Sequence, residues 1–118
     1  MLRCFLVFIC LVCTQLMPAE AKRVALVIGN NSYPNLPDFR QLQKAVNDAR
    51  SMRDTLRDDL GFNVSFAENA DFRTMNNGFK KFEAAVEPGD VVFMYFSGHG
   101  VSIGGENFLL PSDIPRPV

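Results

Sequence analysis

The sequence predicts a three-layer α/β fold in which a mostly parallel sheet lies between helices. Three short apolar runs alternate with two stretches whose apolar residues recur every three or four positions. Such runs are typical of strands buried on both faces, and the recurring spacing is typical of amphipathic helices. The resulting order β-α-β-α-β favours right-handed crossovers that place helices on both faces of the sheet.

The first strand and helix lie in the first half of this domain. The apolar run Val24–Ile28 predicts a strand that stops at Gly29, before a loop with two prolines. From Leu42 to Leu60 the apolar residues form one stripe, which predicts a helix. Gly61 stands where a helix-terminating glycine is expected.

The second half contains the remaining predicted elements. Phe62–Ala67 is expected to be a short strand, and Asp71 is a candidate cap for a helix that stops at Pro88-Gly89. Val91–Phe96, the most hydrophobic run after the amino-terminal segment, is predicted to be the central strand. Asn107–Leu110 is expected to be a further short strand.

The amino terminus has the pattern of a secretory signal peptide over residues 1–21. A positive start and an apolar stretch precede an Ala-x-Ala cleavage site that ends at Ala21. The alternative is an uncleaved anchor, but a spanning helix needs about 20 apolar residues and this stretch is shorter. We therefore expect export to the periplasm or outside the cell, no membrane attachment after cleavage, and a single domain over residues 22–118.

Charge and cysteine content exclude some partners and some kinds of chemistry. The formal net charge is −1 and the charges are interspersed, which gives no reason to expect nucleic acid as a partner. The chain's thiols all lie within the predicted signal peptide: Cys4, Cys10 and Cys13. Residues 22–118 therefore contain neither a disulfide nor a thiol nucleophile.

His99, the only histidine, is the main candidate for chemistry. It directly follows the last long apolar run, and the carboxyl ends of strands are where α/β sheets bind ligands. Gly98 and Gly100 flank it, so the Gly100 N–H is a candidate oxyanion donor. A purely structural histidine is the alternative. No cysteine or carboxylate is suitably spaced for zinc, so no metal site is assigned.

Four segments together resemble the caspase-like peptidases. Their sequences are Ile-Gly-Asn, Leu-x-x-Ala-x-Asn-Asp-Ala, Tyr-Phe-Ser-Gly-His-Gly and Asn-Phe-Leu-Leu-Pro-Ser-Asp, at residues 28–30, 42–49, 95–100 and 107–113. They are similar to the large-subunit half of that family, and most similar to its metacaspase and bacterial caspase-like branch. The resemblance covers essentially all of residues 22–118.

The resemblance implies a cysteine endopeptidase with a Cys–His dyad that acts on polypeptides. No cofactor is assigned, and a calcium requirement stays open. His99 would be the base and Gly100 N–H would hold the oxyanion. Asp48 and Ser97 would line an S1 pocket that prefers Arg or Lys. Asp48 is alternatively a solvated helix residue, and Ser97 a small packing residue. Asp113 is either a loop cap or part of a calcium site such as some metacaspases have.

The sequence departs from the family pattern at the nucleophile. The family's cysteine follows its histidine by about 50 residues, whereas only residues 100–118 follow His99 and none is cysteine. We therefore expect a fold incomplete at its carboxyl end, with activity in a longer protein or in a complex whose second chain supplies the cysteine. The alternatives are a non-catalytic binding or scaffold module and a truncated reading frame.

Overall fold

The computed structural model describes residues 20–117. The predicted signal peptide, residues 1–21, lies almost entirely outside the described residues, as do all the cysteines. Among residues 20–117, none of the helices combines the length and the apolar character that crossing a bilayer requires.

A parallel three-stranded sheet forms the framework, with strand order β2-β1-β3. β1 spans Arg23–Gly29, β2 spans Asn63–Glu68 and β3 spans Val91–Ser97. β1 pairs in parallel with both neighbours, so that Leu26 lies between Ser65 and Met94. The predicted α/β class with a mostly parallel sheet is confirmed.

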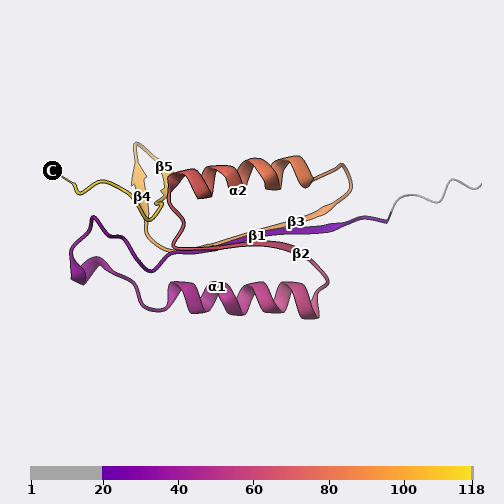
Figure 1. The fold of residues 1–118 in the computed structure, drawn as a ribbon. Coiled ribbons are helices and arrows are strands. Elements are labelled where there is room, and N and C mark those ends of the chain that lie inside the picture. The colour runs from indigo at the N-terminus through magenta and orange to yellow at the C-terminus, as the bar shows by residue number, and fades with distance from the viewer. Residues whose placement is uncertain (1–19, 118) are drawn as a thin grey trace, which may run out of the picture.

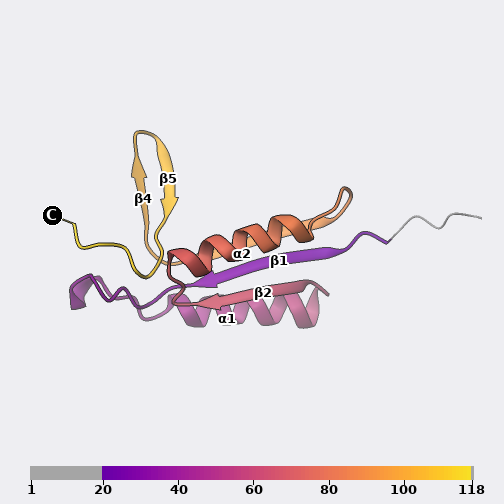
Figure 2. The same ribbon diagram turned by 45° about the horizontal axis from the view of Figure 1, so that its top comes forward.

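The two main helices lie on opposite faces of the sheet, which gives the three layers (Figure 1). α1 spans Ala45–Asp54 and α2 spans Phe72–Ala85. Both β1 and β2 point toward the end of the molecule where a short hairpin stands away from the sheet (Figure 2). The carboxyl ends of the strands and this hairpin therefore lie together.

Side chains of β1 alternate between the two helix layers. Ala25 and Val27 form one core cluster with Ala49 of α1, whereas Leu26 and Ile28 form the other with Met75 of α2. Successive strand residues point to opposite faces, so a continuous apolar strand is the sequence that a sheet covered on both sides requires.

The first predicted helix is shorter than its apolar stripe suggested. α1 begins at Ala45 rather than Leu42, and its last turn continues as a π-helical turn over Thr55–Asp59. Gly61 follows with a positive φ of 68°, as expected for a glycine that ends a helix. Leu60 is 45% exposed, so the end of the predicted stripe does not join the core.

The second helix begins as the sequence predicts. The Asp71 carboxylate accepts a hydrogen bond from Thr74 N at 2.7 Å, which satisfies one unpaired amide of the first turn. Along the helix, Met75 is buried and Phe79 and Phe82 pack against the same cluster, whereas Phe72 is exposed. The helix ends before Pro88 and Gly89, as expected.

Two strand predictions were wrong or incomplete. Within residues 20–117, β3 is an edge strand and β1 is the central one, because both crossovers return to the two sides of β1. The second difference is a hairpin of β4, Gly100–Ile103, paired antiparallel with β5, Glu106–Leu109. The sequence suggested only the second of these strands; Gly104 and Gly105, both with positive φ, form the turn.

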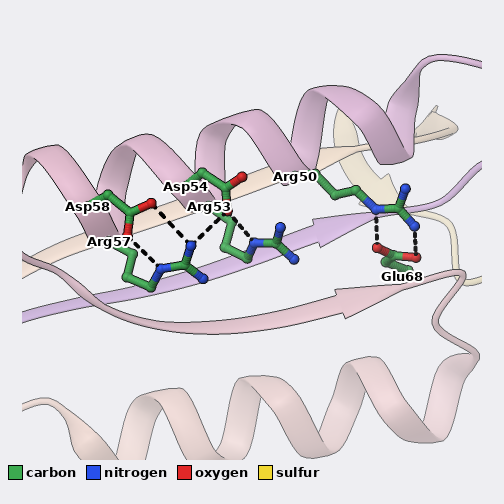
Figure 3. A network of polar contacts seen from close by, with 6 residues as sticks. All are labelled: Arg50, Arg53, Asp54, Arg57, Asp58 and Glu68. Atoms are coloured by element: carbon green, nitrogen blue, oxygen red, sulfur yellow. Dashed lines mark hydrogen bonds and ion pairs between the residues drawn. The ribbon is translucent and has the colours of Figure 1, made fainter.

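A row of ion pairs runs along α1 and the turn that follows it, and one of these pairs joins the helix to the sheet (Figure 3). The Arg50 guanidinium donates two hydrogen bonds to Glu68 of β2, with Nε–Oε1 and Nη2–Oε2 distances of 2.5 and 2.8 Å. Arg53 lies 4.4 Å from the ring centroid of Phe66, also on β2, and pairs with Asp54. Arg50 and Arg53 of α1 therefore both contact β2.

Candidate active site

The candidate site lies at the carboxyl ends of the strands. His99 stands between the end of β3 at Ser97 and the start of β4 at Gly100, and it is half-buried. The loop that follows β1 approaches it from the other side. The site is therefore assembled from segments that are about 60 residues apart in the sequence.

The His99 ring is held by a backbone carbonyl of that loop. Its Nε2 lies 2.5 Å from the carbonyl oxygen of Arg40, the last residue of a short 3-10 turn over Asp38–Arg40. A carbonyl oxygen only accepts, so Nε2 must carry the proton. In the neutral imidazole the other nitrogen, Nδ1, is then the unprotonated one and is able to act as a base.

Tyr33 contacts both the backbone and the ring of His99. The His99 N–H donates to the Tyr33 hydroxyl at 2.8 Å, and the two ring centroids are 4.7 Å apart. The hydroxyl in turn donates to the carbonyl of Leu110 at 3.2 Å. Tyr33 is fully buried, and burial raises the pKa of its phenol, partly opposed by the hydrogen bonds from His99 and Asn30. The phenol is therefore neutral and able to donate.

Asn30 is a second buried polar residue in this region. Its side-chain oxygen accepts from Ala70 N at 2.8 Å, and its amide nitrogen lies 3.4 Å from the carbonyls of Ala70 and Leu110. These bonds join the end of β1 to the segments before α2 and after β5. A buried amide with all its groups paired fixes one arrangement of the surrounding backbone.

The two glycines beside His99 play different structural roles. A Cβ at Gly98 would lie 2.7 Å from both the Phe96 Cζ and the Tyr33 hydroxyl, so this glycine makes room for these two side chains. At Gly100 the direction of the amide matters. The preceding carbonyl, of His99, accepts from Leu110 N at 2.9 Å. In a trans peptide the N–H points opposite to the C=O, so the Gly100 N–H points away from β5.

A cavity of about 620 Å³ opens beside the histidine. His99 and Gly100 line it together with Arg40, and most of the remaining wall is apolar, formed by Leu36, Pro37, Phe39, Val101, Leu110, Ile114 and Pro117. The predicted base and the predicted oxyanion donor therefore share one cavity. Its wall contains no carboxylate among the described residues.

The two predicted specificity residues lie outside this cavity wall. Asp48 is exposed in the first turn of α1. Ser97 is half-buried at the end of β3, where its carbonyl accepts from Asn30 N at 2.8 Å. The structure thus brings His99 and Gly100 together and leaves Asp48 and Ser97 as predictions.

Asp113 has a structural partner. Its carboxylate accepts a hydrogen bond from the Phe72 N–H at 2.8 Å, at the first residue of α2. Of the two roles that the sequence allows, the loop cap is the one that this contact fits. Within residues 20–117, His, Asp and Glu side chains form no group of three that is arranged to hold a metal ion.

Three residues that hold His99 or its surroundings were not predicted from the sequence. Arg40 acts through its carbonyl oxygen, so its side chain gives no signal in the sequence. Asn30 and Tyr33 do give one: a polar residue directly after a buried strand, and an aromatic residue three positions later. Asn30 is completely buried, which its polarity alone would not predict.

The fold and the site together define an α/β domain with a histidine at the carboxyl end of a parallel strand, facing a cavity. Comparison with family models assigns residues 22–117 to the caspase domain. The chain belongs to this family, which confirms the resemblance drawn from its motifs at the level of the family.

Among curated proteins, the chain is similar to a human protein and to its mouse homologue. It is 30% identical over 100 residues to mucosa-associated lymphoid tissue lymphoma translocation protein 1 of Homo sapiens, and 31% identical over 100 residues to its Mus musculus homologue. Each match covers 85% of this chain but 12% of the relative. The chain thus spans about an eighth of the length of these relatives.

Proposed function

We propose that this domain supplies the general base and an oxyanion donor of a caspase-like cysteine endopeptidase. The observation that carries the proposal is the contact of His99 Nε2 with the Arg40 carbonyl, beside a cavity that Gly100 also lines. Holding Nε2 in its protonated form leaves Nδ1 as the basic nitrogen, which is the form that a neighbouring thiol requires.

In the proposed reaction, His99 moves the proton twice. Nδ1 first takes the proton of a cysteine thiol, and the thiolate sulfur forms a bond to the substrate's carbonyl carbon. As the C–N bond breaks, the imidazolium returns that proton to the leaving amine. Water then cleaves the thioester, which releases the new carboxyl terminus and restores the thiol. The Arg40 carbonyl stabilises the imidazolium by accepting from Nε2 throughout.

The Gly100 N–H is proposed to donate to the oxyanion of the tetrahedral intermediate. Its direction, away from β5, supports this role. Loss of one such donor typically costs a factor of about 10²–10³ in rate. We further propose that Asp48 and Ser97 line a pocket for Arg or Lys at P1, because a carboxylate pairs well with either cation. This specificity would place the domain in the metacaspase-like branch, including its bacterial members.

A cysteine from another segment of polypeptide has to complete this site, since residues 22–118 contain none. The exposed apolar edge of β3 supports the proposal that a further strand pairs there and presents the thiol. Val91, Val92, Phe93 and Met94 are between 37% and 48% exposed, and an exposed apolar edge strand is suited to pairing with another strand.

Export through a signal peptide at residues 1–21 remains part of the proposal. The mass of the protein recovered from its native compartment tests it: removal of residues 1–21 is the expected result. A chain that retains Met1 and stays with the membrane would contradict cleavage and favour the anchor.

The peptidase test uses the native protein together with the segment that supplies the cysteine. We expect thiol-dependent cleavage of peptides with Arg or Lys at P1. His99→Ala should lower kcat by a factor of about 10²–10⁴, and Asp48→Asn should lower kcat/KM on basic substrates. The 118-residue chain alone should show no thiol-dependent activity once residues 1–21 are removed. Such activity from that chain, or full activity of His99→Ala, would contradict the proposal.

A further inference from the structure

The hairpin that follows His99 contains an interrupted pair of hydrogen bonds. Two directly opposed residues of an antiparallel ladder often exchange two bonds, each N–H donating to the other's C=O. The Leu110 N–H does donate to the His99 carbonyl, at 2.9 Å. The return bond from His99 N–H goes instead to the Tyr33 hydroxyl, at 2.8 Å.

Tyr33 completes the interrupted pair from outside the hairpin. Its hydroxyl accepts from His99 N–H and donates to Leu110 C=O at 3.2 Å, so that it occupies the place of the missing bond. The Asn30 amide, 3.4 Å from the same carbonyl, holds Leu110 from another direction. The His99 N–H is thereby kept from bonding the Leu110 carbonyl directly, while the His99 carbonyl keeps its bond from Leu110 N.

The same residue also contacts the imidazole. The Tyr33 and His99 ring centroids are 4.7 Å apart and the rings are tilted by 52°. The Nε2 atom of the same imidazole contacts the Arg40 carbonyl. Residues 33 and 40 belong to one loop, and the Gln41 side chain bonds both N and O of Tyr33, at 2.7 and 2.8 Å. The loop after β1 therefore contacts His99 at its backbone N–H, at its ring and at Nε2.

We propose that Tyr33 is a positioning residue, whose hydroxyl keeps Nε2 of His99 within hydrogen-bonding distance of the Arg40 carbonyl. Without the hydroxyl, His99 N–H is free to bond Leu110 C=O directly, which draws His99 toward β5 and away from Arg40. The importance of this geometry for catalysis rests on the proposed function. The geometry itself is measurable in a protein with no peptidase activity.

The test compares Tyr33→Phe with Tyr95→Phe in the purified chain, using nitrogen NMR of the imidazole. His99 is the only histidine and these are the only two tyrosines, so the ring signals and the control are both unambiguous. Tyr33→Phe keeps the aromatic ring and removes only the hydroxyl. Tyr95 lies on β3 and packs against the α1 side of the core.

We expect Tyr33→Phe to move the Nδ1 and Nε2 shifts toward each other, as the fixed tautomer gives way to exchange. Tyr95→Phe should leave them at wild-type values. The chemical shift of the His99 amide should also change in Tyr33→Phe. If the amide's hydrogen bond is simply lost, its hydrogen exchange should become roughly five- to tenfold faster. Ring signals that stay unchanged in Tyr33→Phe, or that change equally in both variants, would overturn the proposal. A missing peptidase activity in every longer form would instead remove the proposed function alone.

Discussion

β1 and β3 are strands of nearly the same character in very different surroundings. Both are seven residues long, parallel and largely apolar. From Val24 to Ile28, β1 is at most 6% exposed, whereas the first four residues of β3 are 37–48% exposed. Apolar composition therefore identifies a strand that is suited to burial, and the neighbours in the fold decide whether burial is reached.

The largest expected effect is a loss of stability that differs between two directly paired residues, one on each of these strands. Leu26 of β1 pairs with Met94 of β3, and the two are 2% and 43% exposed. Leu26→Ala should cost about 2–5 kcal/mol of unfolding free energy, because it leaves a cavity in a packed core. Met94→Ala should cost less than about 1 kcal/mol. Urea unfolding of both variants checks this, and equal losses would contradict the contrast between the strands.

The next effect concerns the contact between β1 and α1. A Cβ at Gly29 would lie 2.6 Å from the Ala49 Cβ and 2.9 Å from the Ala45 carbonyl oxygen. Gly29→Ala should therefore destabilise the fold by about 1–3 kcal/mol through overpacking.

Gly78→Ala is the matched control for this substitution. Gly78 lies inside α2, and its added Cβ would be no closer than 3.8 Å to Leu26 Cδ1. Because alanine favours helix, this variant should be more stable by about 0.5–1 kcal/mol. Thermal unfolding that finds both variants destabilised alike would show that the close approach of α1 is not the cause.

A third prediction concerns the two outer edges of the sheet. β2 presents Asn63 and Ser65 as exposed polar residues, whereas β3 presents Val91 and Val92. A lysine on an apolar edge strand opposes pairing with other chains. We expect the wild-type chain to self-associate through the β3 edge at high concentration. Val92→Lys should reduce this association in sedimentation velocity, with little change in melting temperature.

Ser65→Lys, on the β2 edge, is the control and should leave association at the wild-type level. If Val92→Lys also associates as the wild type does, the β3 edge is not the surface through which the chains meet.

The smallest expected effect is the pH dependence of stability that comes from the ion pair between Arg50 of α1 and Glu68 of β2. The hydrogen bonds and charge of Arg50 lower the pKa of Glu68 from its ordinary value of 4.5. A lowered pKa means that the pair stabilises the fold above the unfolded-state pKa, and that this contribution is lost as pH falls below about 4.5.

Glu68→Gln should remove that part of the acid sensitivity and lower the melting temperature at neutral pH by at most a few degrees, since the pair is on the surface. Melting curves from pH 7 to pH 3 measure both. An unchanged acid dependence in Glu68→Gln would assign the loss of stability to other carboxylates.

The contrast between β1 and β3 also explains how far the sequence alone could lead. Periodicity predicted the helices and parallel strands, because apolar spacing reports directly on burial within one element. It placed Val91–Phe96 at the centre of the sheet because hydrophobicity does not record which strand receives the crossovers. The position of His99 was predictable for a similar reason: the end of a parallel strand is fixed by topology.

The residues that hold His99 were harder to predict. Arg40 contributes a carbonyl, which every residue has, and Tyr33 contributes a hydroxyl from 66 residues away in the sequence. Neither contact follows from spacing or propensity, because both depend on how the loop after β1 folds over the end of β3. Gly98 shows the same limit in part: Phe96 and Tyr33 together leave no room for its side chain, and the sequence does not place Tyr33 beside it.

The tautomer of His99 tests the central claim most directly. Nitrogen NMR of the neutral imidazole in the wild-type chain requires no assignment between histidines, since there is one. The contact with the Arg40 carbonyl predicts one fixed form, with Nε2 protonated and Nδ1 unprotonated. Averaged signals, or a proton on Nδ1, would show that the carbonyl does not hold the ring and that Nδ1 is not set to receive a proton from a thiol.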